Sequence, residues 1–273
     1  SGSSDKIPTA QVWVGGSSPM FNVTSTLNQW SNIAVENNGS ATCRLELNLG
    51  SINQIFKSLF IQAVSGHVRF TDSVIKSNGS RLGYSRFEGL NVGSAAPIFI
   101  NIVDSGTTGT TPITFTDRCL FSSGGAGFPL TVVRVENSTL EAVTFEDCTV
   151  IRKNDDLTIV DTTSNPTDRP IAVLDINRCE FDSDVAPGVG EFYFKLSNVQ
   201  NIIFNGNHVN RGGSGDLFDL TNCRVTSVNG NFLSRLNYVF TSDDQTKITG
   251  VGANNGRYDT FDGIIRNQNS SIY

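Results

Sequence analysis

The chain has 273 residues and a formal net charge of −6, with 38% apolar and 17% charged residues. An acidic chain of this kind does not favour a phosphate-binding face, so we expect no nucleic-acid partner. No stretch approaches 18 consecutive apolar residues, so the sequence predicts no membrane-spanning helix and no membrane partner. Low charge density argues against disorder, and the Asn-, Ser-, Thr- and Gly-rich remainder favours β-structure.

Residues 1–40 differ from the rest of the chain. They hold both tryptophans, Trp13 and Trp30, and Pro8 and Pro19 flank the first of them. The open end of a strand-rich fold exposes unpaired strand edges that need a cover. We therefore interpret residues 1–40 as an N-terminal cap or subunit-contact segment. The only methionine is Met20, so we interpret residues 1–4 as the lead of a fragment or of a chain that has lost its initiator.

A short motif recurs through most of the remaining chain. An apolar residue stands three places before a small polar or thiol residue, and these slots are 23 to 31 residues apart. Strand-like alternation precedes each slot, whereas helical periodicity is almost absent. A repeat of this length with variable loops is typical of a solenoid. The slots are occupied by Cys148, Cys179, Asn207, Asn231 and Asn254.

Three further observations extend the repeat. Residues 113–119 fit it with one extra residue before Cys119, and residues 68–73 fit with Ser73 in the slot. A buried Asn at a bend can bond the backbone of neighbouring coils, so the slots predict a ladder of stacked side chains. A second ladder lies nine to eleven residues before four of the slots, at Asn137, Asn198, Asn222 and Asp243.

The five cysteines lack the spacing of a metal site or of a secreted disulfide framework. We expect them to be reduced and mostly buried, and we expect no metal and no cofactor. With only His67 and His208 in the chain, a Ser/His/Asp arrangement is not credible, and we expect His208 to be a surface or packing residue.

The segments VTFEDCTV, IIFNGNHV and VTSVNGNFL resemble coils of right-handed parallel β-helix proteins of the pectate-lyase-like group. The resemblance spans about residues 50 to 260 and concerns architecture. It implies an all-β fold, a right-handed parallel β-helix over residues 41–258, with residues 1–40 and 259–273 as caps. A jelly roll or other β-sandwich is the alternative, because short strands with turn signals also fit it.

Within that group the sequence looks most like a bacteriophage tailspike or receptor-binding appendage. The resemblance implies a homotrimer, located on the virion or outside the cell, whose partner is a bacterial cell-surface polysaccharide. Cleavage of that polysaccharide stays open. Two alternatives remain: a non-catalytic structural or decoration protein of a virion, and a free-standing β-helix polysaccharide hydrolase or lyase.

Carboxylates are the plausible catalysts, because glycoside hydrolysis uses a pair of them. Glu146 follows the inward Phe145 and Asp175 precedes the inward Ile176, so both are expected to face outward from adjacent coils. In-register stacking would separate their backbones by roughly 8 Å. We expect Glu146 to be the acid. Asp147, Asp182 and Glu191 are substitutes for the pair, and the alternative is that all of these acids are ordinary solvated surface residues.

Two further residues are candidates for glycan contact. Tyr193 alternates with Phe192 and Phe194, and an outward tyrosine offers both ring area and a hydroxyl to a sugar; packing of all three in the core is the alternative. Arg178 lies beside the ladder and is the second candidate. No cluster of Asp residues accompanies Arg178, so a Ca²⁺-dependent lyase is less supported than a hydrolase.

Overall fold

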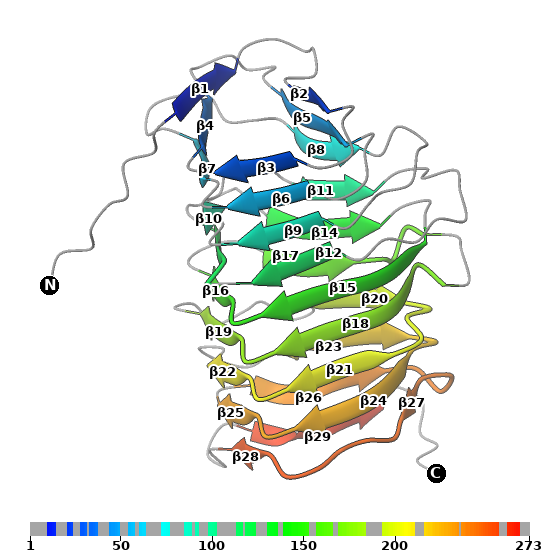
Figure 1. The fold of residues 1–273 in the computed structure, drawn as a ribbon. Helices are drawn as coiled ribbons and strands as arrows, with labels where there is room; N and C mark the ends of the chain where they lie inside the picture. Colours follow the sequence, from blue (N-terminus) through cyan, green and yellow to red (C-terminus); the bar gives the residue numbers. More distant parts are fainter. Residues whose placement is uncertain are drawn as a thin grey trace, which may run out of the picture.

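Each coil of the chain contributes strands to stacked parallel sheets, and the computed structural model is a parallel β-helix (Figure 1). The structure describes the backbone of the strands between residues 10 and 102. Beyond these it describes residues 113–116, 118–123, 130–135, 139–152, 157–165, 169–183, 193–210, 216–234, 236–256 and 261–267. Over this part of the chain there is no helix, and therefore none that is long and apolar enough to cross a membrane.

Four sheets contain these strands. Sheet A consists of β1 (Ala10–Val14), β4 (Ile33–Asn37), β7 (Phe60–Ala63), β10 (Asn91–Val92), β13 (Leu120–Ser123), β16 (Thr149–Arg152), β19 (Glu180–Ser183), β22 (His208–Asn210), β25 (Phe232–Ser234) and β28 (Asn255–Gly256). Sheet C consists of β3 (Asn28–Ser31), β6 (Gln54–Lys57), β9 (Ser85–Glu88), β12 (Ile113–Thr116), β15 (Leu140–Glu146), β18 (Ile171–Asn177), β21 (Ile202–Asn205), β24 (Arg224–Asn229) and β27 (Lys247–Ile248). Sheet D consists of β11 (Ile98–Ile102), β14 (Leu130–Val135), β17 (Leu157–Asp161), β20 (Phe194–Ser197), β23 (Phe218–Thr221), β26 (Leu236–Ser242) and β29 (Phe261–Asn267). Sheet B holds β2 (Phe21–Val23), β5 (Arg44–Leu49) and β8 (Asp72–Lys76).

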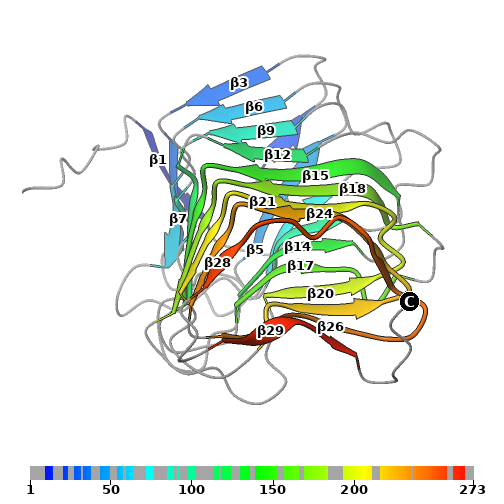
Figure 2. The ribbon, with the colours of Figure 1, turned by 90° about the horizontal axis from the view of Figure 1, so that it is seen from below.

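All pairs among the described strands are parallel, which confirms the predicted β-helix and excludes a jelly roll or β-sandwich, whose sheets are antiparallel. Seen along the axis, sheets A, C and D enclose the core (Figure 2). The apolar residue of each strand alternation points inward, as Phe145 and Ile176 do in register. Phe115 and Phe145 stack with ring centroids 4.8 Å apart, and Phe194 and Phe218 with centroids 4.4 Å apart.

The predicted ladder of stacked slots is confirmed. Asn207 accepts a hydrogen bond from the N–H of Cys179 at 2.8 Å and donates through Nδ2 to the carbonyl of Ile176 at 3.0 Å. Asn231 repeats this arrangement one coil later, with its Oδ1 2.8 Å from the N–H of Asn207. Each buried amide thus ties one coil to the next at the bend between sheets C and A.

The second ladder is also present where the structure describes it. Asn222 donates through Nδ2 to the Oδ1 of Asn198 at 2.7 Å, and its N–H donates to the carboxylate of Asp243 at 3.1 Å. Asn198 and Asn222 have positive φ angles of 61° and 50°, a conformation that Asn tolerates better than most residues. Asn137 lies outside the described residues.

The assignment of Ser73 to the ladder is wrong. Ser73 lies in β8, which pairs with β5 in sheet B and not with the strands of sheet C. The strands that align with β12 in sheet C are β9 and β6, where Phe87 and Phe56 stand in register with Phe115. Alternation of apolar and polar residues predicts a strand, but it does not predict which sheet of the β-helix that strand joins.

Strands belonging to the solenoid extend into both proposed caps. β1, β3 and β4 lie within residues 1–40, where β1 pairs with β4, and β3 pairs with β6 of the next coil. β29 lies within residues 259–273 and pairs with β26 of the preceding coil. A capping or subunit-contact role for residues 1–40 and 259–273 stays a prediction.

Four of the five cysteines are free and buried: Cys119, Cys148, Cys179 and Cys223. Cys43 lies among the residues whose side chains are not described. Hydrogen bonds with the neighbouring thiols of Cys119 and Cys179, together with burial, raise the pKa of Cys148 far above the ordinary thiol range. Burial raises the pKa of Cys223 to about 12.

We expect the stacked thiols of Cys119, Cys148 and Cys179 to resist alkylation in the folded protein. All three side chains are buried and out of reach of the reagent, so iodoacetamide at about pH 8.5, where an exposed thiol is about half thiolate and reacts, should leave all three unmodified. The same reagent should modify them after unfolding in guanidinium. Peptide mapping by mass spectrometry checks this, and rapid native modification of Cys148 would contradict its burial.

Candidate functional site

The outer face of sheet C presents two rows of side chains in register across the coils. One row carries Glu146, Asn177, Asn205 and Asn229 on β15, β18, β21 and β24. The second row lies two residues earlier along the strands and carries Thr144, Asp175, Ile203 and Ser227. Neighbouring strands lie about 4.8 Å apart, so carboxyl, amide and hydroxyl groups repeat at short intervals along this face.

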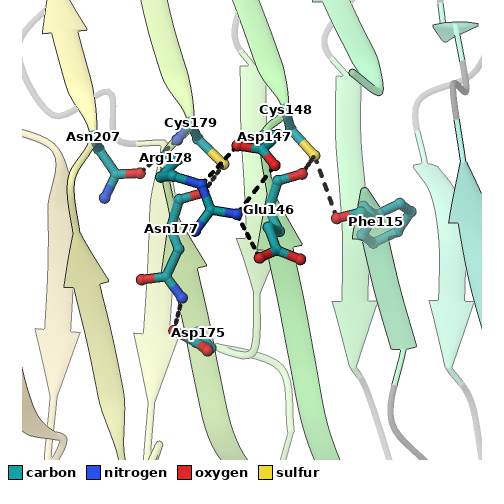
Figure 3. Close-up of polar contacts among 9 residues, drawn as sticks. All are labelled: Phe115, Glu146, Asp147, Cys148, Asp175, Asn177, Arg178, Cys179 and Asn207. Carbon is teal, nitrogen blue, oxygen red and sulfur yellow. Dashed lines mark hydrogen bonds and ion pairs between the residues drawn. The ribbon is translucent and has the colours of Figure 1, made fainter. Parts of the chain in front are cut away.

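The predicted placement of Glu146 and Asp175 is confirmed. Phe145 and Ile176 stack in register, so Glu146 stands opposite Asn177 and Asp175 stands opposite Thr144, one coil and two residues apart. Figure 3 shows Glu146, Asp175 and Asn177. Both side chains are only partly exposed. The charge of Glu146 contributes to the pKa of Asp175.

Burial raises the pKa of Asp175 above its ordinary value. The flanking residues Thr144 and Ile203 explain the loss of hydration, since one of them is apolar and both stand beside Asp175 on adjacent strands. A hydrogen bond from Asn177 Nδ2 to Asp175 Oδ1, at 2.7 Å, lowers the pKa in part. The negative charge of Glu146 raises it further.

Arg178 binds both acidic residues of the preceding coil. Its Nε donates to Asp147 Oδ1 at 2.9 Å, and its Nη2 donates to Glu146 Oε1 at 2.6 Å and to Asp147 Oδ2 at 3.1 Å. The hydrogen bonds with Asp147 and then Glu146 raise the pKa of Arg178. The Arg178 side chain is 57% exposed, so the contacts contribute little to stability and leave the guanidinium open to a ligand. Figure 3 shows these three residues side by side.

At the bend between sheets C and A, charged residues adopt backbone angles that are unfavourable for most residues with a side chain. Arg118, Asp147 and Arg178 have φ angles of 62°, 53° and 52°, in the left-handed region, and the same bend in the next two coils has Gly206 and Gly230. A residue with a Cβ atom in this conformation costs on the order of 1–2 kcal/mol. The left-handed conformation therefore recurs at the residue before the slot in all five of these coils, and three of them place a charged residue there.

The substitute residues do not all join this cluster. Asp147 lies in it, whereas Asp182 lies on β19 in sheet A, where its Oδ1 accepts hydrogen bonds from the Ser183 N–H and from Asn210 Nδ2, both at 3.0 Å. Asp182 is therefore separated from Glu146 and Asp175 by the bend between the sheets. Glu191 lies outside the described residues.

Of the two orientations considered for Tyr193, the structure shows packing in the core, and the outward orientation is wrong. Its side chain is 1% exposed, packs against Phe181 with ring centroids 5.8 Å apart, and donates its hydroxyl to the carbonyl of Asp182 at 3.3 Å. Tyr193 lies at the bend before β20, and the next residue, Phe194, is buried as well. Strand alternation does not hold at such a bend, so it could not predict the orientation of Tyr193.

Sequence reasoning missed Asn177 and the outer face of sheet A. Asn177 stands two residues after Asp175, and period-two alternation alone places both on one face. In sheet A the residue directly after each slot faces outward, which brings Glu180, His208 and Phe232 into one exposed row. In the part of the chain with described side chains, no group of three or more His, Cys, Asp or Glu residues is arranged to hold a metal ion.

Comparison with known proteins adds no relative. No protein-family model, no curated protein and no solved structure matches this chain. The evidence for the parallel β-helix is therefore the strand pairing in the structure. The function must be inferred from the chemistry of the surfaces.

Proposed function

We propose that this protein is a receptor-binding appendage of the bacteriophage tailspike type, and that the outer face of sheet C binds bacterial surface polysaccharide. The observation that carries the proposal is the pair of outward rows, in which amide, hydroxyl and carboxyl groups stand at every position except that of Ile203. A polysaccharide presents hydroxyl groups at regular intervals, and side chains of these types donate to and accept from them. Arg178, at the edge of the rows, supplies an exposed donor beside them.

We further propose that the bound glycan is hydrolysed at Asp175 and Glu146. Glycoside hydrolysis needs one protonated carboxyl for the leaving oxygen and one carboxylate that activates water or attacks the sugar. The raised pKa of Asp175 favours Asp175 as the acid, the reverse of the assignment expected from the sequence. Glu146 is then the base or nucleophile of the pair, and its Oε1 lies 2.6 Å from Nη2 of Arg178.

The proposal includes assembly and location. The resemblance to tailspikes implies a parallel homotrimer on the virion, and closed symmetry is the usual form of such assemblies. Light scattering of the purified chain at micromolar concentration should give the mass of a trimer. A monomer mass would contradict the tailspike proposal and leave the β-helix itself untouched.

The experiment that tests the function uses a panel of purified O-antigens and capsular polysaccharides. Binding is measured by surface plasmon resonance, and cleavage by the release of reducing ends. We expect at least one polysaccharide to be bound and cleaved. Binding without cleavage would overturn the hydrolase part, an unsaturated product would indicate a lyase, and no binding across the panel would favour a structural role in the virion.

A further inference from the structure

A second set of chemically distinctive side chains lies on the outer face of sheet A. Glu180, His208 and Phe232 stand in register on β19, β22 and β25. Nδ1 of His208 lies 3.9 Å from Oε1 of Glu180, and the rings of His208 and Phe232 meet edge to face with centroids 5.0 Å apart. The three residues therefore form one continuous row of a carboxylate, an imidazole and a phenyl ring.

Phe232 is the unusual member of this row. It is 42% exposed, whereas the other phenylalanines with described side chains are buried in the core. Two residues further along the strands, Asn210 Nδ2 donates to Asp182 Oδ1 at 3.0 Å. An exposed ring beside carboxylate and amide groups matches a sugar, because the C–H face of a sugar packs on aromatic rings while its hydroxyls bind polar groups.

The bend between this row and sheet C is uncovered in the same coils. Gly206 separates Asn205 from the strand that carries His208, and Gly230 separates Asn229 from the strand that carries Phe232. Both glycines are exposed and have no side chain at the position where the earlier coils have Asp147 and Arg178. Gly206 and Gly230 thus add no side chain of their own at this corner, where the nearest side-chain atom to the Cβ position of Gly206 is Cγ of Arg178 at 3.6 Å and the nearest atoms to that of Gly230 are backbone atoms of Gly206.

We propose that Phe232 and His208 form an aromatic subsite for a sugar unit of the polysaccharide bound on sheet C, with Glu180 and Asn210 as its polar contacts. This inference rests on the proposed function. It assigns to Phe232 the stacking role that the buried Tyr193 cannot have, and it predicts a binding surface that extends around the corner from Glu146 and Asp175.

The test measures binding of the polysaccharide that the parent selects from the panel of O-antigens and capsules, in the Asp175→Asn background if the parent cleaves it. Phe232→Ala should weaken binding about tenfold, as expected for loss of aromatic stacking, and Phe232→Leu, which keeps apolar bulk without a ring, should weaken it less. Ile265→Ala on β29 of sheet D removes an equally exposed apolar side chain, 39% exposed, away from the row, and should change nothing.

Nuclear magnetic resonance of the histidine rings gives an independent measurement. The chain has two histidines, so a His67→Gln variant leaves the ring signals of His208 alone. The polysaccharide should shift these signals. If the parent binds polysaccharide but Phe232→Ala binds equally well and the His208 signals do not move, the subsite is wrong and the proposed function stands. If the parent binds no polysaccharide, both are wrong.

Discussion

Replacing Asp175 by Asn is expected to lower polysaccharide turnover by roughly a hundredfold or more, because the reaction loses its proton donor. Glu146→Gln should lower turnover to a similar extent through loss of the carboxylate that activates water or attacks the sugar. Reducing-end release from the selected polysaccharide measures both. Binding of the polysaccharide should stay close to that of the parent.

The same Asp175→Asn variant is expected to keep or gain stability. Burial raises the pKa of Asp175 in the folded protein, so folding favours its protonated form. The contribution of Asp175 to stability is therefore largest at acidic pH, and it falls as the pH rises through the raised folded-state pKa. Asparagine has no charge to desolvate and keeps an Oδ1 acceptor for Asn177, so the variant should melt no lower than the parent at neutral pH.

Glu141→Gln is the matched control for both variants. Glu141 lies on the same strand as Glu146, is exposed, and loses the same charge on substitution. It should leave turnover and melting temperature unchanged. Full activity of Asp175→Asn and Glu146→Gln on a polysaccharide that the parent cleaves would place the catalytic groups elsewhere on the molecule.

Replacing Asn231 by Asp should cost about 1–3 kcal/mol of unfolding free energy, because it removes donors from a buried position. Nδ2 of Asn231 donates to the carbonyl of Phe204 at 2.9 Å and to Oδ1 of Asn254 at 2.8 Å. A carboxylate would face both of these acceptors without a hydrogen to share. Urea denaturation at neutral pH measures the loss, which should shrink at acidic pH as the carboxyl becomes protonated.

Asn229→Asp makes the same chemical change two residues away on the exposed side of the strand. Water can replace the contact that Asn229 Nδ2 makes with the Ser227 hydroxyl, so this variant should lose much less stability. Equal denaturation midpoints for Asn231→Asp and the parent would contradict a structural role for the ladder.

The repeat was readable from sequence because it follows from local chemistry. Inward positions such as Phe145 and Ile176 must be apolar, and a slot such as that of Asn231 accepts only a small side chain that can bond to the next coil. Both requirements recur once per coil, so they leave a period in the sequence. The outward positions of Glu146 and Asp175 followed from the same alternation.

Features that depend on contacts between coils could be known only from the tertiary structure. The sheet that a strand joins is defined by its partner strand in the neighbouring coil, and Ser73 was misplaced because β8 pairs with β5 and not with a strand of sheet C. Tyr193 is buried because two faces meet at its bend, where period-two alternation ends. The raised pKa of Asp175 arises from burial beside residues on β15 and β21, which lie some 30 residues away in the chain. Likewise, Arg178 reaches Glu146 and Asp147 only because successive coils stack in register, so the charged cluster exists in the folded molecule and has no sequence motif of its own.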